Sequence, residues 1–204
     1  MTQIKSLLCT LCLILTTACD TNHYTFKISE QTLKIPNEYV RTEHLGIRDA
    51  PGFDSDGGTI WLKIYTTKIA NKADRSLFDN IKEYRGFEER GRFDFEITPL
   101  KNMDLKTKTE PEYATTYYNL EDYVKQKDSV MPGIIKNSEG TTEAICSVGW
   151  RDRETKKRSC SNNVIHGSIV FEYYLPLDYM MQPGRKKQLD DYLRGLIDQW
   201  VVKN

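Results

Sequence analysis

The sequence predicts an α+β fold: a sandwich-like, antiparallel, β-rich domain with an amphipathic C-terminal helix packed on it. Two patterns predict this class. Short segments in the first two thirds of the chain alternate apolar and polar residues, as half-buried strands do, whereas the last twenty residues space their apolar positions for a helix. The 29 basic and 29 acidic side chains balance, so the chain lacks the basic excess typical of nucleic-acid-binding proteins.

Four segments alternate clearly enough to be predicted as strands. Residues 24–28 and 32–35 are short candidates, and residues 59–66 show the strictest period of two. Residues 92–97 repeat the pattern, so we expect these two segments to turn one apolar row inward: Ile60, Leu62 and Ile64 from the first, and Phe93, Phe95 and Ile97 from the second. Residues 101–116 are polar with scattered apolar residues and are expected to be a loop or irregular strand. Residues 127–142 are again polar, and Pro132, Gly133 and Gly140 interrupt them.

Two segments are predicted to be helical. Residues 119–125 form a short helix with Asn119 as its N-cap. A longer helix spans about 184–203, with an apolar stripe whose default partner is the sheet, although a stripe of this kind also docks on partners or membranes. The stripe consists of Leu189, Leu193, Leu196, Ile197, Trp200 and Val201, and the pairs Lys186–Asp190 and Lys187–Asp191 stand at i,i+4 spacing.

The N-terminus has the organisation of an export signal. Residues 1–18 carry Lys5, an apolar stretch and small residues before Cys19. The ending from Leu15 to Cys19 resembles a bacterial lipobox, which implies cleavage before Cys19, acylation of Cys19 (palmitate among its chains) and a lasting membrane anchor. Residues 19–23 would then be a tether, and residues 24–204 a single domain. An ordinary cleaved signal is the alternative, and the choice between inner and outer membrane stays open despite Asp20.

The other cysteines separate into two groups. Cys9 and Cys12 form a C-x-x-C, but they lie inside the apolar stretch that export removes, which argues against a redox or zinc role. Cys146 and Cys160 remain as an even pair in an oxidising compartment, so we expect a disulfide between predicted strands at 144–150 and 163–174. Two free thiols are the alternative.

Two charged segments are candidate partner-binding surfaces. The first is an acidic loop within residues 46–58, with Asp49, Asp54 and Asp56, whose spacing does not match a calcium-binding loop. The second is the run 151–158, which we expect to be the exposed connection of the disulfide-tied hairpin and which carries Arg151, Arg153, Lys156, Lys157 and Arg158. Each has a plainer interpretation, as a solvated turn.

Motifs for catalysis are absent. The sequence contains no G-x-S-x-G, S-x-x-K, H-E-x-x-H, G-x-G-x-x-G or phosphate-binding loop. The three histidines, His23, His44 and His166, are scattered. We therefore expect no enzymatic activity, cofactor or metal, and the weaker alternative is a hydrolase with residues dispersed along the chain.

Several short segments are shared with a group of small bacterial lipoproteins. They are the Ile35-Pro36-Asn37-Glu38-Tyr39 segment, the Gly57-Gly58 pair before a strand, and Cys160 with the later Leu175-Pro176. In this the chain resembles periplasmic immunity proteins that block phospholipase effectors of the type VI secretion system. The resemblance implies a lipid-anchored periplasmic protein that binds and neutralises a secreted lipase toxin. The alternative is a structural or assembly lipoprotein of the envelope without a toxin partner.

Overall fold

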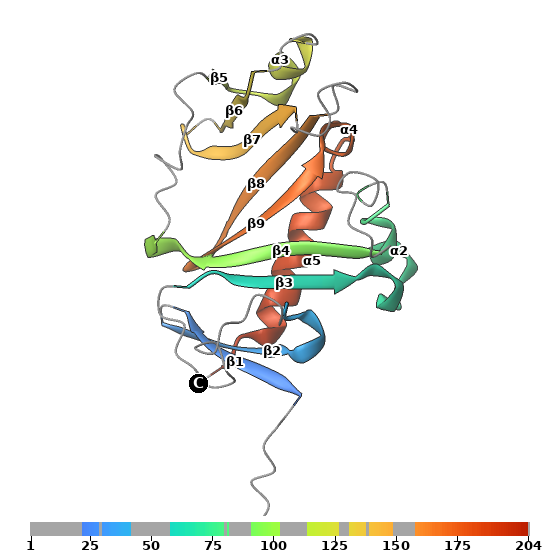
Figure 1. Cartoon of the computed structure of the whole chain (residues 1–204), viewed down its shortest axis with the longest axis vertical. Helices are drawn as coiled ribbons and strands as arrows, with labels where there is room; N and C mark the ends of the chain where they lie inside the picture. The colour runs from blue at the N-terminus through green and yellow to red at the C-terminus, as the bar shows by residue number, and fades with distance from the viewer. Residues whose placement is uncertain are drawn as a thin grey trace, which may run out of the picture.

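A seven-stranded sheet forms the centre of the computed structural model (Figure 1). The structure describes residues 22–28, 30–41, 58–79, 81, 91–102, 114–126, 131–137, 139–148 and 158–203. Across the sheet the order is β3 (Ile60–Tyr65), β4 (Arg92–Pro99), β9 (Ile169–Pro176), β8 (Arg158–His166), β7 (Thr142–Val148), β6 (Gly133–Lys136) and β5 (Thr115–Tyr117). All neighbours pair antiparallel except β5 and β6, which are parallel.

A separate antiparallel hairpin, β1 (His23–Ile28) with β2 (Gln31–Pro36), lies at one end of the molecule. The short helix α3 (Leu120–Lys125) lies at the opposite end, beside β5 and β6 (Figure 1). Shorter helical turns connect the strands: η1 (Asn37–Tyr39), η4 (Thr66–Lys68), α2 (Lys72–Ser76), η5 (Leu100–Asn102) and α4 (Leu177–Met180).

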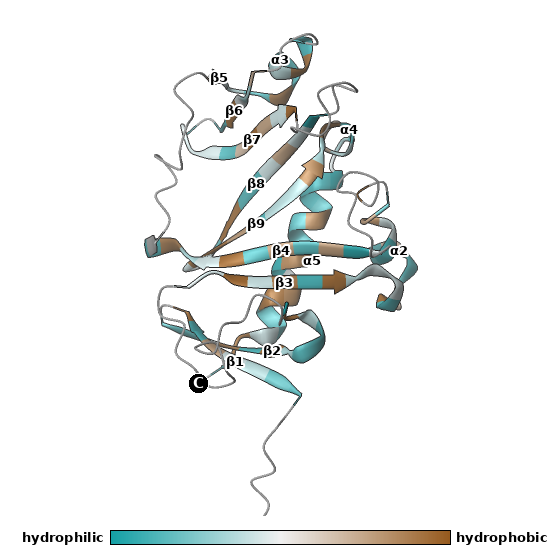
Figure 2. Ribbon diagram, viewed as in Figure 1, coloured by the Kyte–Doolittle hydropathy of each residue, from teal (hydrophilic) through white to brown (hydrophobic). Residues whose placement is uncertain are grey.

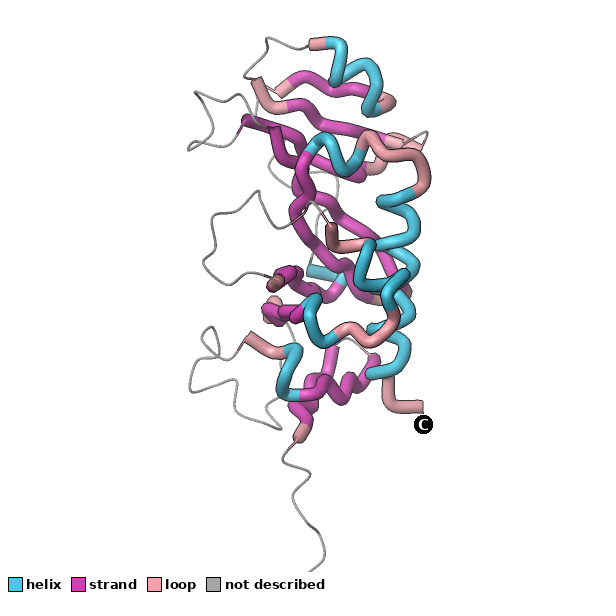
Figure 3. The backbone as a smooth tube through the Cα atoms, turned by 90° about the vertical axis from the view of Figure 1, so that its right-hand side faces the viewer, coloured by secondary structure: helices cyan, strands magenta, loops and turns pink. Residues whose placement is uncertain are grey.

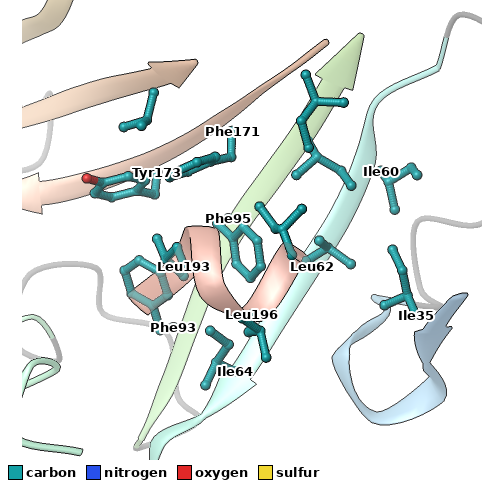
Figure 4. Packing of buried hydrophobic residues seen from close by; sticks show 14 of the residues in the cluster. Ile35, Ile60, Leu62, Ile64, Phe93, Phe95, Phe171, Tyr173, Leu193 and Leu196 are labelled. Carbon is teal, nitrogen blue, oxygen red and sulfur yellow. The ribbon is translucent and has the colours of Figure 1, made fainter. Parts of the chain in front are cut away.

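The long helix α5 (Arg185–Trp200) runs along one face of the strands (Figure 3). Apolar and polar residues alternate along β3 and β4 (Figure 2), so each strand turns one apolar row toward the helix. Figure 4 shows Leu193 and Leu196 of α5 against these rows. The buried set from these elements is Ile60, Leu62, Ile64, Phe93, Phe95, Ile97, Leu189, Leu193, Leu196, Ile197 and Trp200.

This packing confirms the predicted α+β class, the inward faces of β3 and β4, and the default orientation of the C-terminal stripe. The helix begins after Gly184, whose φ of 71° is left-handed, a conformation that glycine adopts at no steric cost. The helix ends at Trp200, earlier than the predicted 203. Val201 forms a β-bridge with Leu33, and the Val202 N–H donates to the Thr32 carbonyl at 2.8 Å. The last residues thus tie the hairpin to the domain.

One expectation about the strands is wrong. Residues 163–174 are not one strand, because the chain reverses at Gly167 and Ser168, which places His166 opposite Ile169 and separates β8 from β9. Gly167 has φ of 59°, which suits a tight hairpin turn. The polar stretch 127–142 contains the short strand β6, which the sequence did not indicate and whose Ile134 and Ile135 are buried.

Candidate binding surfaces

The end of the sheet formed by β5–β8 is closed by a disulfide. Cys146 of β7 and Cys160 of β8 face each other in register and are bonded, which confirms the predicted pair. Pairing of the two strands ends two residues farther along, where Val148 lies opposite Arg158. The bond therefore fixes both ends of the connection at 149–157, whose own residues lie outside the described part of the chain.

Arg158 belongs to this end, but not to the exposed loop in which we expected it. It is the first residue of β8 and only 8% exposed. Its guanidinium lies over the ring of Tyr123, 5.0 Å from the centroid, and donates a hydrogen bond to the carbonyl of Gln126, the C-cap of α3. A cation at a helix C-terminus is favourable, so Arg158 holds α3 to the sheet. The expectation of an exposed Arg158 is wrong.

Tyr123 is the side chain by which α3 packs on the sheet. It is 1% exposed and lies edge-on to Tyr117, with the ring centroids 5.4 Å apart. A Cβ at Gly133 of β6 would overlap the Tyr123 ring, so only glycine fits there. Asn119 accepts a hydrogen bond from the Asp122 backbone N–H at 2.8 Å, which confirms the predicted N-cap.

The remaining predicted site residues lie outside the described residues. They are the lipidation candidate Cys19, the acidic-loop residues Asp49, Asp54 and Asp56, and the basic-loop residues Arg151, Arg153, Lys156 and Lys157. Their roles stay predictions.

A cavity that the sequence did not indicate lies on the α5 side of the sheet. It measures about 530 Å³ and is bounded by η1, the end of β3, the segment through η4 to α2, and one side of α5. Three tyrosines line it: Tyr39 from η1, Tyr65 from β3 and Tyr192 from α5. Gly195, also on α5, contributes no side chain, and a Cβ there would meet nothing within 4 Å.

Two of the tyrosine rings are held by the core behind them. Tyr39 packs on Trp200 at 5.1 Å between centroids, and Tyr192 packs edge-on against Phe78 at 5.6 Å. Burial raises the pKa of Tyr192 to about 12, and Tyr39 and the Asp74 carboxylate add to that rise. Burial and the nearby Glu38 carboxylate raise the pKa of Tyr39 as well. Both hydroxyls therefore stay protonated at neutral pH.

Four charged side chains line the cavity: Glu38, Lys68, Asp74 and Asp191. Lys68 Nζ lies 3.5 Å from Glu38 Oε2. Asp191 receives Lys187 Nζ at 2.6 Å and Arg194 Nη1 at 3.1 Å, and the Lys187 hydrogen bond is the main reason that its pKa is lowered. Within the described residues Asp74, which is half-buried, has no ion pair.

The sequence indicates the positions of two cavity tyrosines, but not the cavity itself. Tyr192 stands three residues after Leu189 and four before Leu196, so it belongs to the edge of the predicted apolar stripe. Tyr39 closes the Ile35–Tyr39 segment. No local pattern, however, brings Tyr39, Asp74 and Tyr192 together, since they come from three separate elements.

The described residues contain no set of three His, Cys, Asp or Glu side chains placed to hold a metal. His166 and Asp198 form an exposed pair, with Nε2 and Oδ1 2.7 Å apart. Among the helices of the described ranges, none combines the length and the apolar character needed to cross a bilayer.

No protein-family model matches the sequence, and no curated protein matches it either. Among solved structures, the chain is similar to the iron-regulated outer membrane lipoprotein FrpD of Neisseria meningitidis, at 12% sequence identity and a TM-score of 0.38. That alignment covers 89% of this chain and 93% of the other.

Proposed function

We propose that this chain is a lipid-anchored protein of the bacterial envelope that binds and neutralises a toxic protein effector and catalyses no reaction itself. The observation that carries the proposal is the export signal that ends in Cys19. The bonded pair Cys146–Cys160 supports export, because disulfides persist in oxidising compartments such as the periplasm. Anchoring by several acyl chains would keep the protein at the bilayer.

Inhibition by binding needs a rigid scaffold that presents a loop. The disulfide and the Arg158–Tyr123 contact supply rigidity at the base of the connection 149–157, and loops held by a rigid framework commonly carry recognition. The resemblance to immunity proteins suggests a secreted lipase as the effector. The acidic loop near Asp54 is the second predicted contact surface.

Anchoring is tested with Cys19→Ser. The wild-type protein should incorporate labelled palmitate and sediment with membranes, whereas the variant should lose the label and appear in the soluble fraction. Cys12→Ser is the matched control, since it removes a thiol from the same segment and should change neither result. A palmitate-labelled Cys19→Ser protein would contradict the assignment.

Neutralisation is tested by co-expression in the periplasm with a secreted lipase toxin encoded beside this gene. Cells that produce the protein should survive, and a direct complex should be recovered on purification. Reversal of the other four cations of the basic loop to Glu (Arg151, Arg153, Lys156 and Lys157), with Arg158 left unchanged, should weaken that complex if the loop is the contact surface. Cell death at the same rate with and without the protein would refute the immunity function.

A further inference from the structure

We propose that the cavity beside α5 binds an organic cation, an alkylammonium or guanidinium group, between the rings of Tyr39 and Tyr192 and the Asp74 carboxylate. The inference rests on the lining of the cavity alone. It goes beyond the proposed function, because neither anchoring nor neutralisation assigns a ligand to this cavity.

The size of the cavity suits an organic ligand. About 530 Å³ lies within the range of small-molecule sites and exceeds the need of a single water or metal ion. Gly195 keeps the space open, because every other residue at this position would project its side chain from α5 into it. Leu196 and Ile64 of the lining also belong to the main apolar cluster, so the core supports this part of the wall.

The charges of the lining select a cation. Glu38 is paired with Lys68, and Asp191 is paired with two cations of its own helix. The negative charge of Asp74 is left without a partner among the described residues, so the unpaired charge of the lining is negative. An anion would be repelled by this carboxylate, and a neutral apolar ligand would desolvate it without compensation.

The aromatic side chains favour the same ligand. Ring faces carry negative potential and attract ammonium and guanidinium groups. Tyr65 already receives two such groups, Lys68 Nζ at 5.4 Å and Lys63 Nζ at 5.6 Å from its centroid. The rings of Tyr39 and Tyr192 have no cation against them in the described part of the chain, which leaves them available. Burial is the main cause of the raised pKa of both tyrosines, and the nearby carboxylates, Glu38 for Tyr39 and Asp74 for Tyr192, add to it.

The test measures binding of matched probes to the full exported protein by calorimetry and by NMR. Choline is compared with its neutral isostere 3,3-dimethylbutan-1-ol, and N-acetyl-lysine methylamide with N-acetyl-norleucine methylamide. We expect at least one cation to bind about tenfold more tightly than its neutral counterpart. The Asp74 carboxylate and the two ring faces attract a positive charge, which the neutral probe lacks. Tighter choline would indicate a small amine or lipid headgroup, and tighter lysine amide a protein side chain.

Two variants localise the binding. Asp74→Asn should weaken the cation about tenfold while leaving the neutral probe unchanged, and Asp178→Asn, an equal change of charge outside the cavity, should have no effect. Gly195→Leu should abolish binding by filling the space, whereas Gly195→Ala should preserve most of it. Circular dichroism would confirm that each variant is folded. Absence of cation binding at millimolar concentrations, equal binding of charged and neutral probes, or full affinity in Asp74→Asn would each overturn the proposal.

Discussion

The two ends of the sheet are stabilised in different ways. The larger apolar cluster, packed around α5, contains twenty-three buried residues of the described chain, whereas the smaller cluster at the end formed by β5–β8 and α3 contains five: Tyr123, Ile135, Ala144, Cys146 and Cys160. Burial of apolar area is the main stabilising contribution, so the smaller cluster depends more heavily on its disulfide, its helix cap and Arg158. Stability should therefore differ along the molecule.

Removal of a core side chain under α5 should have the largest effect. Leu193 is fully buried, and Leu193→Ala should lower the free energy of unfolding by about 2–5 kcal/mol through lost burial and a residual cavity. Urea denaturation followed by tryptophan fluorescence measures it. Ile135→Ala in the smaller cluster is the comparison, and it should affect global unfolding less. Equal losses would mean that the two ends unfold as one unit.

Loss of the disulfide should act mainly on the other end. The bond closes a loop with a sequence separation of 14, so Cys146→Ala with Cys160→Ala should cost about 3 kcal/mol in the chain-entropy description. Hydrogen exchange should accelerate in β6–β8 and leave the central turns of α5 protected. A uniform acceleration across both ends would argue against regional stability.

The cap of α3 offers a smaller perturbation of the same end. Asn119→Ala removes the acceptor for the Asp122 N–H and should destabilise by about 1 kcal/mol. Hydrogen exchange of the α3 amides measures this destabilisation most directly. Asn119→Asp retains a capping acceptor and should restore most of the protection, which separates capping from loss of side-chain packing.

The smallest expected effect is the loss of stability of the α5 half at alkaline pH. The folded pKa of Tyr192 is about 12 against an ordinary 10, so the folded state holds the proton longer than the unfolded state does. The contribution of the protonated Tyr192 hydroxyl to the free energy of unfolding is fully present below pH 10. It is lost as pH rises from about 10 to 12. Because the ring is only half-buried, solvent screening limits it to about 1 kcal/mol. Tyr192→Phe should flatten the fall in stability over this window, and an unchanged slope would contradict the assignment.

Residues with strictly local signals were predictable from sequence. The alternation of β3 and β4, the Asn119 cap, the α5 stripe and the ion pairs Lys186–Asp190 and Lys187–Asp191 depend on neighbours within a few positions, and all were confirmed. The disulfide was predictable because the sequence has only two cysteines, Cys146 and Cys160, after residue 19.

Features decided by tertiary context were not predictable. Residues 169–173 of β9 are buried on both faces, so the run lacks alternation and hides the turn at Gly167. Arg158 ends a charged run that is typical of an exposed loop, and only the packing of α3 against the sheet buries its guanidinium. The cavity depends on η1, β3, η4, α2 and α5, which the fold brings together and which no spacing along the chain encodes.

The bridge between Leu33 and Val201 has a consequence for the order of folding. Synthesis from the N-terminus delivers β1 and β2 early, whereas Val201, which bridges to β2, follows much later. Leu33 and Ile35, both fully buried in the finished domain, therefore stay uncovered until α5 and Val201 have been made. Such long-range closure is slow, and the waiting apolar hairpin is open to misassociation. Val201 and Val202 thus complete the attachment of the β1–β2 hairpin to the domain.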